Sequence, residues 1–122
     1  MTEILPTSVF VADEFKRAAR ALRKRYRKID SDLEPLIDQL KNGELPGDQI
    51  PDLTELIVYK VRVKNSDARR GKSGGYRVIY YILTPVAIVL LRLYSKSDQD
   101  DITQDDIRTT IKKFQADDTE ST

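Results

Sequence analysis

The pattern of apolar and polar positions predicts a basic amphipathic helix near the start of the chain. A short β-prone piece, 9–11, comes first. From Phe15 to Ile29 the apolar residues then recur at helical spacing, with Lys and Arg at most positions between them. We expect this helix to begin at Ala12 or Asp13 and to present one apolar face and one basic face.

A second helix is predicted directly after the first. Residues 31–34, Ser-Asp-Leu-Glu, have the spacing of a capping box, and an apolar stripe follows as far as Leu40. Pro35 is compatible with this start because it falls in the first turn, and the Asn-Gly pair at 42–43 predicts the end. The two helices are close enough in sequence to form a helical hairpin.

Further along the chain the apolar period changes from that of a helix to that of a strand. Residues 45–53 contain two Pro and one Gly and are expected to form a loop. Three strands are then predicted at 57–64, 76–83 and 86–94, the last two joined by a tight turn at Thr84-Pro85. The third strand is apolar on both faces, which suits the interior of a sheet covered by helices.

The chain is expected to close with a short helix. Thr103 stands three residues before Asp106 in a capping spacing, and the residues that follow, as far as Phe114, form an apolar stripe. The polar and acidic residues 115–122 predict a frayed tail.

The order of these elements predicts an α+β fold, a small antiparallel sheet with an N-terminal helical hairpin and a C-terminal helix. The length of 122 residues predicts one domain, which we assign to residues 1–116, with a disordered acidic tail at 117–122. No run approaches 18 apolar residues, and the first residues lack the pattern of a signal peptide. We therefore expect a soluble, cytoplasmic protein with no membrane contact.

Composition excludes several classes of chemistry. The chain has no His and no Cys, so His general bases, catalytic triads, thiol nucleophiles, disulfides and His or Cys metal sites are excluded. The acidic clusters at 98–101 and 105–106 lack the Gly and the closing Glu of an EF-hand loop, and helix capping or solubility explains them more simply. We expect no metal and no cofactor, so any catalysis has to use Lys, Arg, Tyr, hydroxyl or carboxylate groups.

Charge is segregated along the chain, although the net charge is only +1. Residues 12–28 carry eight Lys and Arg against two acids, and residues 60–77 carry seven against one, so each block has a net charge of +6. The acidic blocks 30–55 and 98–120 have net charges of −7 and −5. Because local patches set the field that a polyanion meets, an anionic partner is not excluded. A solvated helix face is the simpler interpretation of the first block.

Cations also stand at alternating positions on the predicted strands. Strand parity places the members of each set on one face of their strand, but it does not fix whether the strands turn these faces to the same side. Cations are costly to bury on interior strands, so they favour a concave site for an anion such as phosphate, and a solvent-facing surface is the simpler alternative. The cations are Lys60, Arg62 and Lys64 on the first strand, Arg77 on the second, and Arg92 and Lys96 on the third, where Tyr94 shares their face.

The glycine-rich loop at 68–75 does not fit a Walker motif. Ser66 stands where the first Gly of that motif is required, and the loop joins two strands rather than a strand and a helix. Its Gly residues are expected to permit a turn, and its cations Arg69, Arg70 and Lys72 to contact a nucleic-acid backbone. Most of the tyrosines nearby are expected to be packing residues, whereas Tyr94, at a strand end, can present its hydroxyl to a ligand.

Three segments together resemble the toxins of type II toxin–antitoxin modules, in the RelE/HigB branch of the RelE/ParE superfamily. They are 59–63 (Tyr-Lys-Val-Arg-Val), 71–81 (Gly-Lys-Ser-Gly-Gly-Tyr-Arg-Val-Ile-Tyr-Tyr) and 91–96 (Leu-Arg-Leu-Tyr-Ser-Lys). The similarity extends from about Phe10 to Phe114 and implies a β-α-α-β-β-β-α order. The stretch Ser-Gly-Gly-Tyr-Arg-Val-Ile-Tyr-Tyr is its most specific part.

The resemblance implies a ribosome-dependent mRNA endonuclease in which the 2′-OH attacks the adjacent phosphate. It assigns Arg77 to the scissile phosphate, with Arg62 and Lys96 adding positive charge. Lys60 is the candidate base, provided that neighbouring cations favour loss of its proton. RelE-like members carry a catalytic Tyr in the C-terminal helix, which this chain lacks, so Tyr94 and Lys96 are the candidates to replace it. The expected RNA-binding residues are Lys64, Arg69, Arg70, Lys72 and Arg92.

The expected partners are a cognate antitoxin, the ribosome and mRNA. An acidic segment of the antitoxin would lie over the basic surface. Two other functions stay open at this point. A ParE-like toxin of the same fold would poison DNA gyrase without hydrolysing RNA, and a non-catalytic module would bind RNA only.

Overall fold

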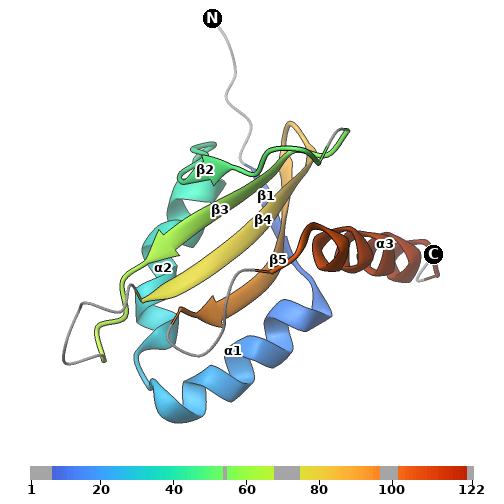
Figure 1. Ribbon diagram of the computed structural model, residues 1–122. Helices are drawn as coiled ribbons and strands as arrows, with labels where there is room; N and C mark the ends of the chain where they lie inside the picture. Colours follow the sequence, from blue (N-terminus) through green and yellow to red (C-terminus); the bar gives the residue numbers. More distant parts are fainter. Residues whose placement is uncertain (1–6, 54, 68–74, 97–101, 121–122) are drawn as a thin grey trace, which may run out of the picture.

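The computed structural model describes residues 7–53, 55–67, 75–96 and 102–120, and within them it contains three helices and five strands (Figure 1). This confirms the predicted α+β class. In chain order the elements are β1 (Ser8–Val11), α1 (Asp13–Arg25), α2 (Ile29–Lys41), β2 (Asp48–Gln49), β3 (Val58–Val63), β4 (Tyr76–Thr84), β5 (Ala87–Ser95) and α3 (Gln104–Glu120).

All five strands form one sheet in the order β1-β5-β4-β3-β2. The pairs β5-β4, β4-β3 and β3-β2 are antiparallel, as expected, but β1 pairs with β5 in parallel. The prediction of a purely antiparallel sheet is therefore wrong at this edge. The reason is topological: the chain leaves β1 for the two helices and re-enters the sheet on its far side, so β1 and β5 share no turn that would make them antiparallel.

Strand β2 was not expected, because the Pro and Gly residues around it predict a loop. Its two residues pair antiparallel with β3, Asp48 opposite Lys60 and Gln49 opposite Tyr59. Gly47, with φ 92°, brings its backbone against the carbonyl oxygen of Lys60, where a Cβ atom would not fit. The glycine that favours a loop thus permits the close approach of β2.

The two long helices of the N-terminal half, α1 and α2, cover one face of the sheet. Their apolar stripes pack on inward side chains of β3, β4 and β5 and form the larger core cluster. Its fully buried members include Ile29, Leu40, Tyr76, Val78 and Tyr80. The helical hairpin predicted from the sequence is thus confirmed as one layer of the fold.

Helix α3 packs on the opposite face and projects from the side of the sheet where β5 lies (Figure 1). Ile107 and Ile111 of α3 enter a second core cluster with Ile79, Tyr81 and Leu91. Strand β5 contributes to both clusters, which confirms the prediction of an interior strand that is apolar on both faces. None of the helices described is long and apolar enough to cross a membrane.

The start of α2 differs from the prediction. The helix begins at Ile29, so Ser31 lies inside it and the predicted capping box is wrong. The carboxylate of Asp67 supplies the cap instead, because it accepts a hydrogen bond of 2.8 Å from the Lys28 N–H. Pro35 then lies beyond the first turn of the helix. A cap from 39 residues away leaves no local pattern in the sequence.

The remaining helix ends follow their predicted signals more closely. Helix α1 begins at Asp13, and α2 ends before Asn42 and Gly43, where Gly43 has a φ of 87°. The Thr103 hydroxyl accepts a hydrogen bond of 3.1 Å from the Asp106 N–H at the start of α3. This helix continues to Glu120, so the frayed tail expected from residue 115 is wrong over that stretch.

Candidate functional site

Cations from neighbouring strands meet on the face of the sheet that α3 packs against. Arg62 of β3 lies opposite Arg77 of β4, and Arg77 lies opposite Tyr94 of β5. Residues paired in this way have Cα atoms about 4.5–5.5 Å apart and point their side chains to the same face. We call this set the arginine row: Arg62, Arg77 and Tyr94.

A second row lies two residues along the strands on the same face. Lys60 lies opposite Ile79, and Ile79 lies opposite Arg92. Ile79 and Tyr94 both belong to the core cluster under α3, which fixes the side to which the two rows point. The structure therefore decides the question that strand parity left open, because it turns the cations of the three strands to one side.

An irregularity in β5 produces this alignment. Tyr80 pairs with Leu90, whereas Ile79 pairs with Arg92, so Leu91 is an extra residue with no register partner on β4. The bulge shifts the alternation of side chains by one residue, so that Arg92 and Tyr94 point to the same face as Val89. Without it, the face that carries Arg77 would receive Leu93 in place of Tyr94.

Arg77 is the most buried cation of the site. Its residue is 9% exposed, and its Nη1 donates a hydrogen bond of 3.3 Å to the Tyr76 carbonyl oxygen. Arg62 is exposed and Lys60 is half-buried. Positive charge held partly out of water attracts an anion more strongly than charge on an open surface does. An anion over the arginine row would also interact favourably with two guanidinium groups that would otherwise only repel each other.

Tyr94 and Lys96 differ in accessibility at the end of β5. Tyr94 is 3% exposed, so its ring packs in the core and has no open face on which a base could stack. Any catalytic part for Tyr94 is confined to its hydroxyl. Lys96 is exposed, and its backbone N–H donates a hydrogen bond of 3.0 Å to the Gly75 carbonyl oxygen. Gly75 has a φ of 60°, as expected for the glycine that ends the loop.

Arg92 faces α3. Its Nη1 lies 3.4 Å from the Thr110 hydroxyl, and that hydroxyl donates to the Asp106 carbonyl oxygen at 2.8 Å. The side chain thus ties β5 to α3, and the expectation that Arg92 is an RNA contact finds no support in its position. Lys64 is exposed just beyond β3, whereas Arg69, Arg70 and Lys72 lie outside the described residues.

The acidic cluster 105–106 serves the helix. Asp105 forms an ion pair of 3.6 Å with Arg108, and the Asp106 N–H is capped by Thr103. In the part of the chain that the structure describes, no group of acidic side chains is placed to hold a metal ion. The other predicted acidic cluster, 98–101, lies outside the described residues.

The family model of the RelE toxin of the RelE / RelB toxin-antitoxin system matches residues 7–120. The chain belongs to the RelE toxin family. No curated protein matches the chain. The three segments that carry the resemblance thus lie in a chain whose family is shown over nearly its whole length, and the mixed α+β fold agrees with it. A RelE-family toxin is one half of a toxin–antitoxin system, so an antitoxin is its partner.

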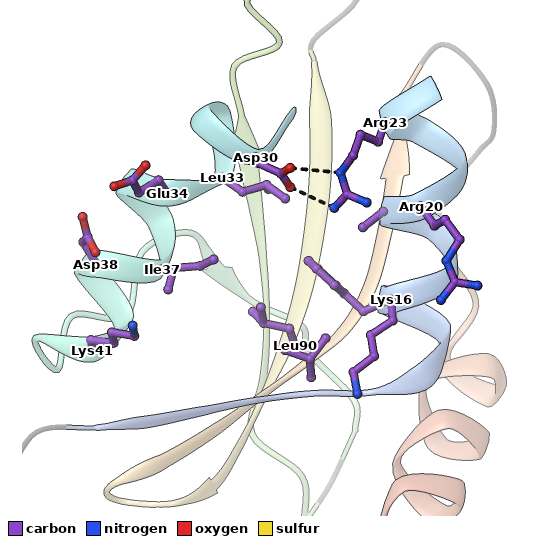
Figure 2. Close-up of a pocket in the computed structure, with 13 residues that line it drawn as sticks. Lys16, Arg20, Arg23, Asp30, Leu33, Glu34, Ile37, Asp38, Lys41 and Leu90 are labelled. Carbon is purple, nitrogen blue, oxygen red and sulfur yellow. Dashed lines mark hydrogen bonds and ion pairs between the residues drawn. The ribbon is translucent and has the colours of Figure 1, made fainter. Parts of the chain in front are cut away.

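A groove between α1 and α2 lies on the opposite face of this RelE-family toxin (Figure 2). Its volume is about 600 Å³. Figure 2 shows Lys16, Arg20 and Arg23 on the α1 side, and Glu34 and Asp38, with Lys41 at the end of the helix, on the α2 side. The floor is apolar and includes Phe15, Leu33, Ile37 and Leu90.

An ion pair closes one end of this groove. The guanidinium of Arg23 donates two hydrogen bonds of 2.9 Å to the Asp30 carboxylate (Figure 2). These bonds hold the pKa of Asp30 below its ordinary value. The sequence predicted the basic face of α1 but not the groove. The signal was the acidic block that follows directly, from which Asp30 points toward Arg23 of α1 (Figure 2).

Proposed function

We propose that this RelE-family toxin is a metal-independent endoribonuclease that cleaves mRNA on the ribosome. The alignment of Arg62 and Arg77 on one face, with Lys60 two residues along β3, carries the proposal. Guanidinium groups suit a phosphodiester, because its two non-bridging oxygens can accept paired N–H donors. Ribosomes and mRNA are cytoplasmic, so the proposal places the toxin there.

The cleavage that these groups support is an internal transfer of the phosphoryl group. The 2′-oxygen of one ribose forms a bond to the adjacent phosphorus, and the bond from phosphorus to the 5′-oxygen breaks. The products are a 2′,3′-cyclic phosphate and a free 5′-hydroxyl. Arg77 and Arg62 stabilise the additional negative charge of the transition state, which is the largest contribution that a site of this kind can make.

Two protons have to move during this reaction. The proton of the 2′-OH passes to a base, for which Lys60 is our candidate, and a proton reaches the leaving 5′-oxygen from Lys96 or the Tyr94 hydroxyl. The chain has no His to fill either position. In this proposal the ribosome contributes by positioning the substrate, because it holds the mRNA with the 2′-OH in line with the scissile bond.

The test is the chemistry of the mRNA ends. After induction of the toxin, we expect new mRNA 5′-ends on ribosomes, and these ends should carry hydroxyl groups. A model mRNA with a single 2′-deoxynucleotide at a mapped site should resist cleavage there. Growth arrest without new ends would overturn the proposal. Inhibition of purified gyrase in a supercoiling assay, with intact mRNA, would favour the ParE-like alternative.

We also propose that the antitoxin lays a helix in the groove between α1 and α2. The apolar floor fits the apolar stripe of an amphipathic helix, and the two charged walls define its flanks. The flank toward Lys16 and Arg20 should be acidic, and the flank toward Glu34 and Asp38 basic.

Charge reversal on one wall tests the docking of the antitoxin. Lys16→Glu combined with Arg20→Glu should weaken antitoxin binding at least tenfold, while the ribosome-bound mRNA is still cleaved. Reversal of Arg17 on α1 and Lys112 on α3, two exposed cations that do not line the groove, is the matched control and should leave antitoxin binding intact. Equal affinity of the groove variant and the control would place the antitoxin elsewhere.

A further inference from the structure

A second cavity lies beside the arginine row, on the same face of the sheet. Its volume is about 330 Å³, at the lower end of the range for small-ligand sites. Strand β2 and its loop form one wall, the start of α3 forms another, and β3 and β4 contribute Lys60 and Ile79. Three isoleucines, Ile50, Ile79 and Ile102, provide its apolar lining.

The position of this cavity relates it to the proposed cleavage site. Asp48 and Lys60 are register partners, and Lys60 lies two residues along β3 from Arg62. Two residues of a strand span about 6.7 Å, which is close to the length of one nucleotide in a single strand. A phosphate held by the arginine row would therefore bring a neighbouring base to the mouth of the cavity.

The polar groups of the cavity are suited to reading the edge of a base. The Gln104 side-chain amide donates a hydrogen bond of 3.3 Å from its Nε2 to the Pro51 carbonyl oxygen. This bond leaves the Oε1 of Gln104 as an acceptor for a ligand. The carboxylate of Asp48 can only accept hydrogen bonds. Gly47 allows β2 to approach β3 closely, so Asp48 is held beside Lys60 of the neighbouring strand.

We propose that this cavity binds one nucleobase of the mRNA next to the scissile phosphate, with the isoleucines against its flat face. Asp48 and Gln104 select a base that has an exocyclic amino group, which adenine, cytosine and guanine have and uracil lacks. Uracil would direct a carbonyl oxygen at the carboxylate, an unfavourable contact. The inference rests on the proposed endoribonuclease function.

The base composition at mapped cleavage sites tests the selection. For the wild-type toxin we expect uracil to be depleted at one fixed position beside the scissile bond. Asp48→Asn provides a donor as well as an acceptor and should raise the frequency of uracil there about fivefold, the lower end of the effect of one base contact. Asp13→Asn, the same change at an exposed position of α1 over the opposite face, should leave the base composition unchanged.

A uniform effect of the Asp48 change would have a different meaning. If Asp48→Asn slows cleavage equally at all sites and leaves the uracil frequency as it was, Asp48 orients Lys60 and selects no base, and the inference fails. Ile102→Phe, which fills the cavity, should erase the preference at the same position. A preserved preference in that variant would also exclude the cavity.

A binding experiment separates this inference from the cleavage reaction. In NMR titrations of the whole toxin, adenosine and cytidine 5′-monophosphates should shift the side-chain amide signals of Gln104 more than uridine 5′-monophosphate does. Shifts of equal size for the three nucleotides would overturn the selection. If the wild-type toxin leaves mRNA uncut on ribosomes while the Gln104 signals still discriminate among the nucleotides, the proposed function fails and the base site stands.

Discussion

The two faces of the sheet are buried to a similar depth and have different chemistry. Along β4, residues 76–81 are all buried, yet Tyr76, Val78 and Tyr80 enter the core under α1 and α2, whereas Arg77 lies on the opposite face. The core cluster on the first face consists of aliphatic and aromatic side chains. The second combines a smaller core with the cations of the proposed site. Depth of burial therefore does not distinguish the face under α1 and α2, which we call the structural face, from the face that carries the proposed site.

The covering helices explain the difference. Two helices of 13 residues each pack their apolar stripes on the first face, and the core that they form with it is hydrophobic. On the second face α3 reaches Ile79 and Tyr81, while Arg62 beyond them stays exposed. A sheet that is covered by two helices on one side and by one on the other can hold cations at the edge of a core.

The largest effect should follow from a change in the arginine row. Arg77→Ala removes the most buried guanidinium, and we expect the cleavage rate on ribosomes to fall about 10²–10³-fold, the range for loss of one transition-state contact. Arg77→Lys keeps the charge but loses the bidentate fork, so it should recover only part of the rate. Cleavage is measured from the rate at which mapped 5′-ends appear.

Arg17→Ala is the matched control, because Arg17 is an exposed arginine of α1 on the other side of the molecule. Its rate should equal that of the wild type. A wild-type rate for the Arg77→Ala variant, with a normal thermal unfolding curve, would remove the arginine row from the mechanism.

The neighbouring residue on the same strand should show the opposite behaviour. Val78 is fully buried under α1 and α2, and Val78→Ala should lower the free energy of unfolding by about 2 kcal/mol. The cleavage rate per folded molecule should stay at the wild-type value. Urea denaturation measures the first quantity. A large loss of activity in the folded variant would mean that the two faces are not independent.

Local patterns in the sequence were sufficient to predict most of the fold. The helical spacing of α1, the capping signals of α3 and the alternation along β3 each depend on residues within about two turns of one another. Parity then placed Lys60 and Arg62 on one face of their strand. These predictions hold because the physical cause and its sequence signal lie in the same segment.

The features that the sequence did not predict depend on residues far apart. The cap of α2 comes from Asp67, and β2 forms only because β3 offers it an edge. The bulge at Leu91 decides which side chains of β5 join the arginine row, and no residue type in that apolar run indicates it. Thus the site's residue types were predictable, whereas the alignment that makes them a site was not.

Two tyrosines of the structural face should differ in their contribution to stability. The Tyr80 hydroxyl donates to the Pro46 carbonyl oxygen, whereas among the described residues the Tyr76 hydroxyl is buried with no hydrogen-bond partner. Tyr80→Phe should therefore lower the free energy of unfolding by about 1 kcal/mol, and Tyr76→Phe should leave it unchanged or raise it. Urea denaturation of both variants checks this, and a larger loss for Tyr76→Phe would contradict it.

The same two hydroxyls predict a loss of stability in alkali. Burial is the main cause that raises the pKa of Tyr76 and of Tyr80 well above the ordinary value of 10.0. Above pH 10 the unfolded chain therefore releases protons that the folded chain keeps, and the free energy of unfolding falls as the pH rises. The fall should be shallower in the double variant with Phe at both positions than in the wild type.

The smallest effect should come from the ion pair at the rim of the groove. Arg23 and Asp30 are largely exposed, and an exposed pair contributes little even with two hydrogen bonds of 2.9 Å. Because Arg23 lowers the pKa of Asp30, this contribution is present above the ordinary pKa of 3.8 and is lost as the pH falls below it. Asp30→Asn should therefore lower the melting temperature slightly at pH 7 and not at pH 2.

Asp30 also stands in the first turn of α2, where a negative charge interacts favourably with the helix dipole. A double-mutant cycle with Arg23→Gln separates the two causes, since only the pair energy vanishes when either partner is absent. We expect most of the small effect of Asp30→Asn to persist in the Arg23→Gln background. The remainder is the coupling energy between Arg23 and Asp30, which 1 M salt should remove. A coupling as large as the effect of Val78→Ala would show that charge at the rim stabilises this face as strongly as its apolar core does.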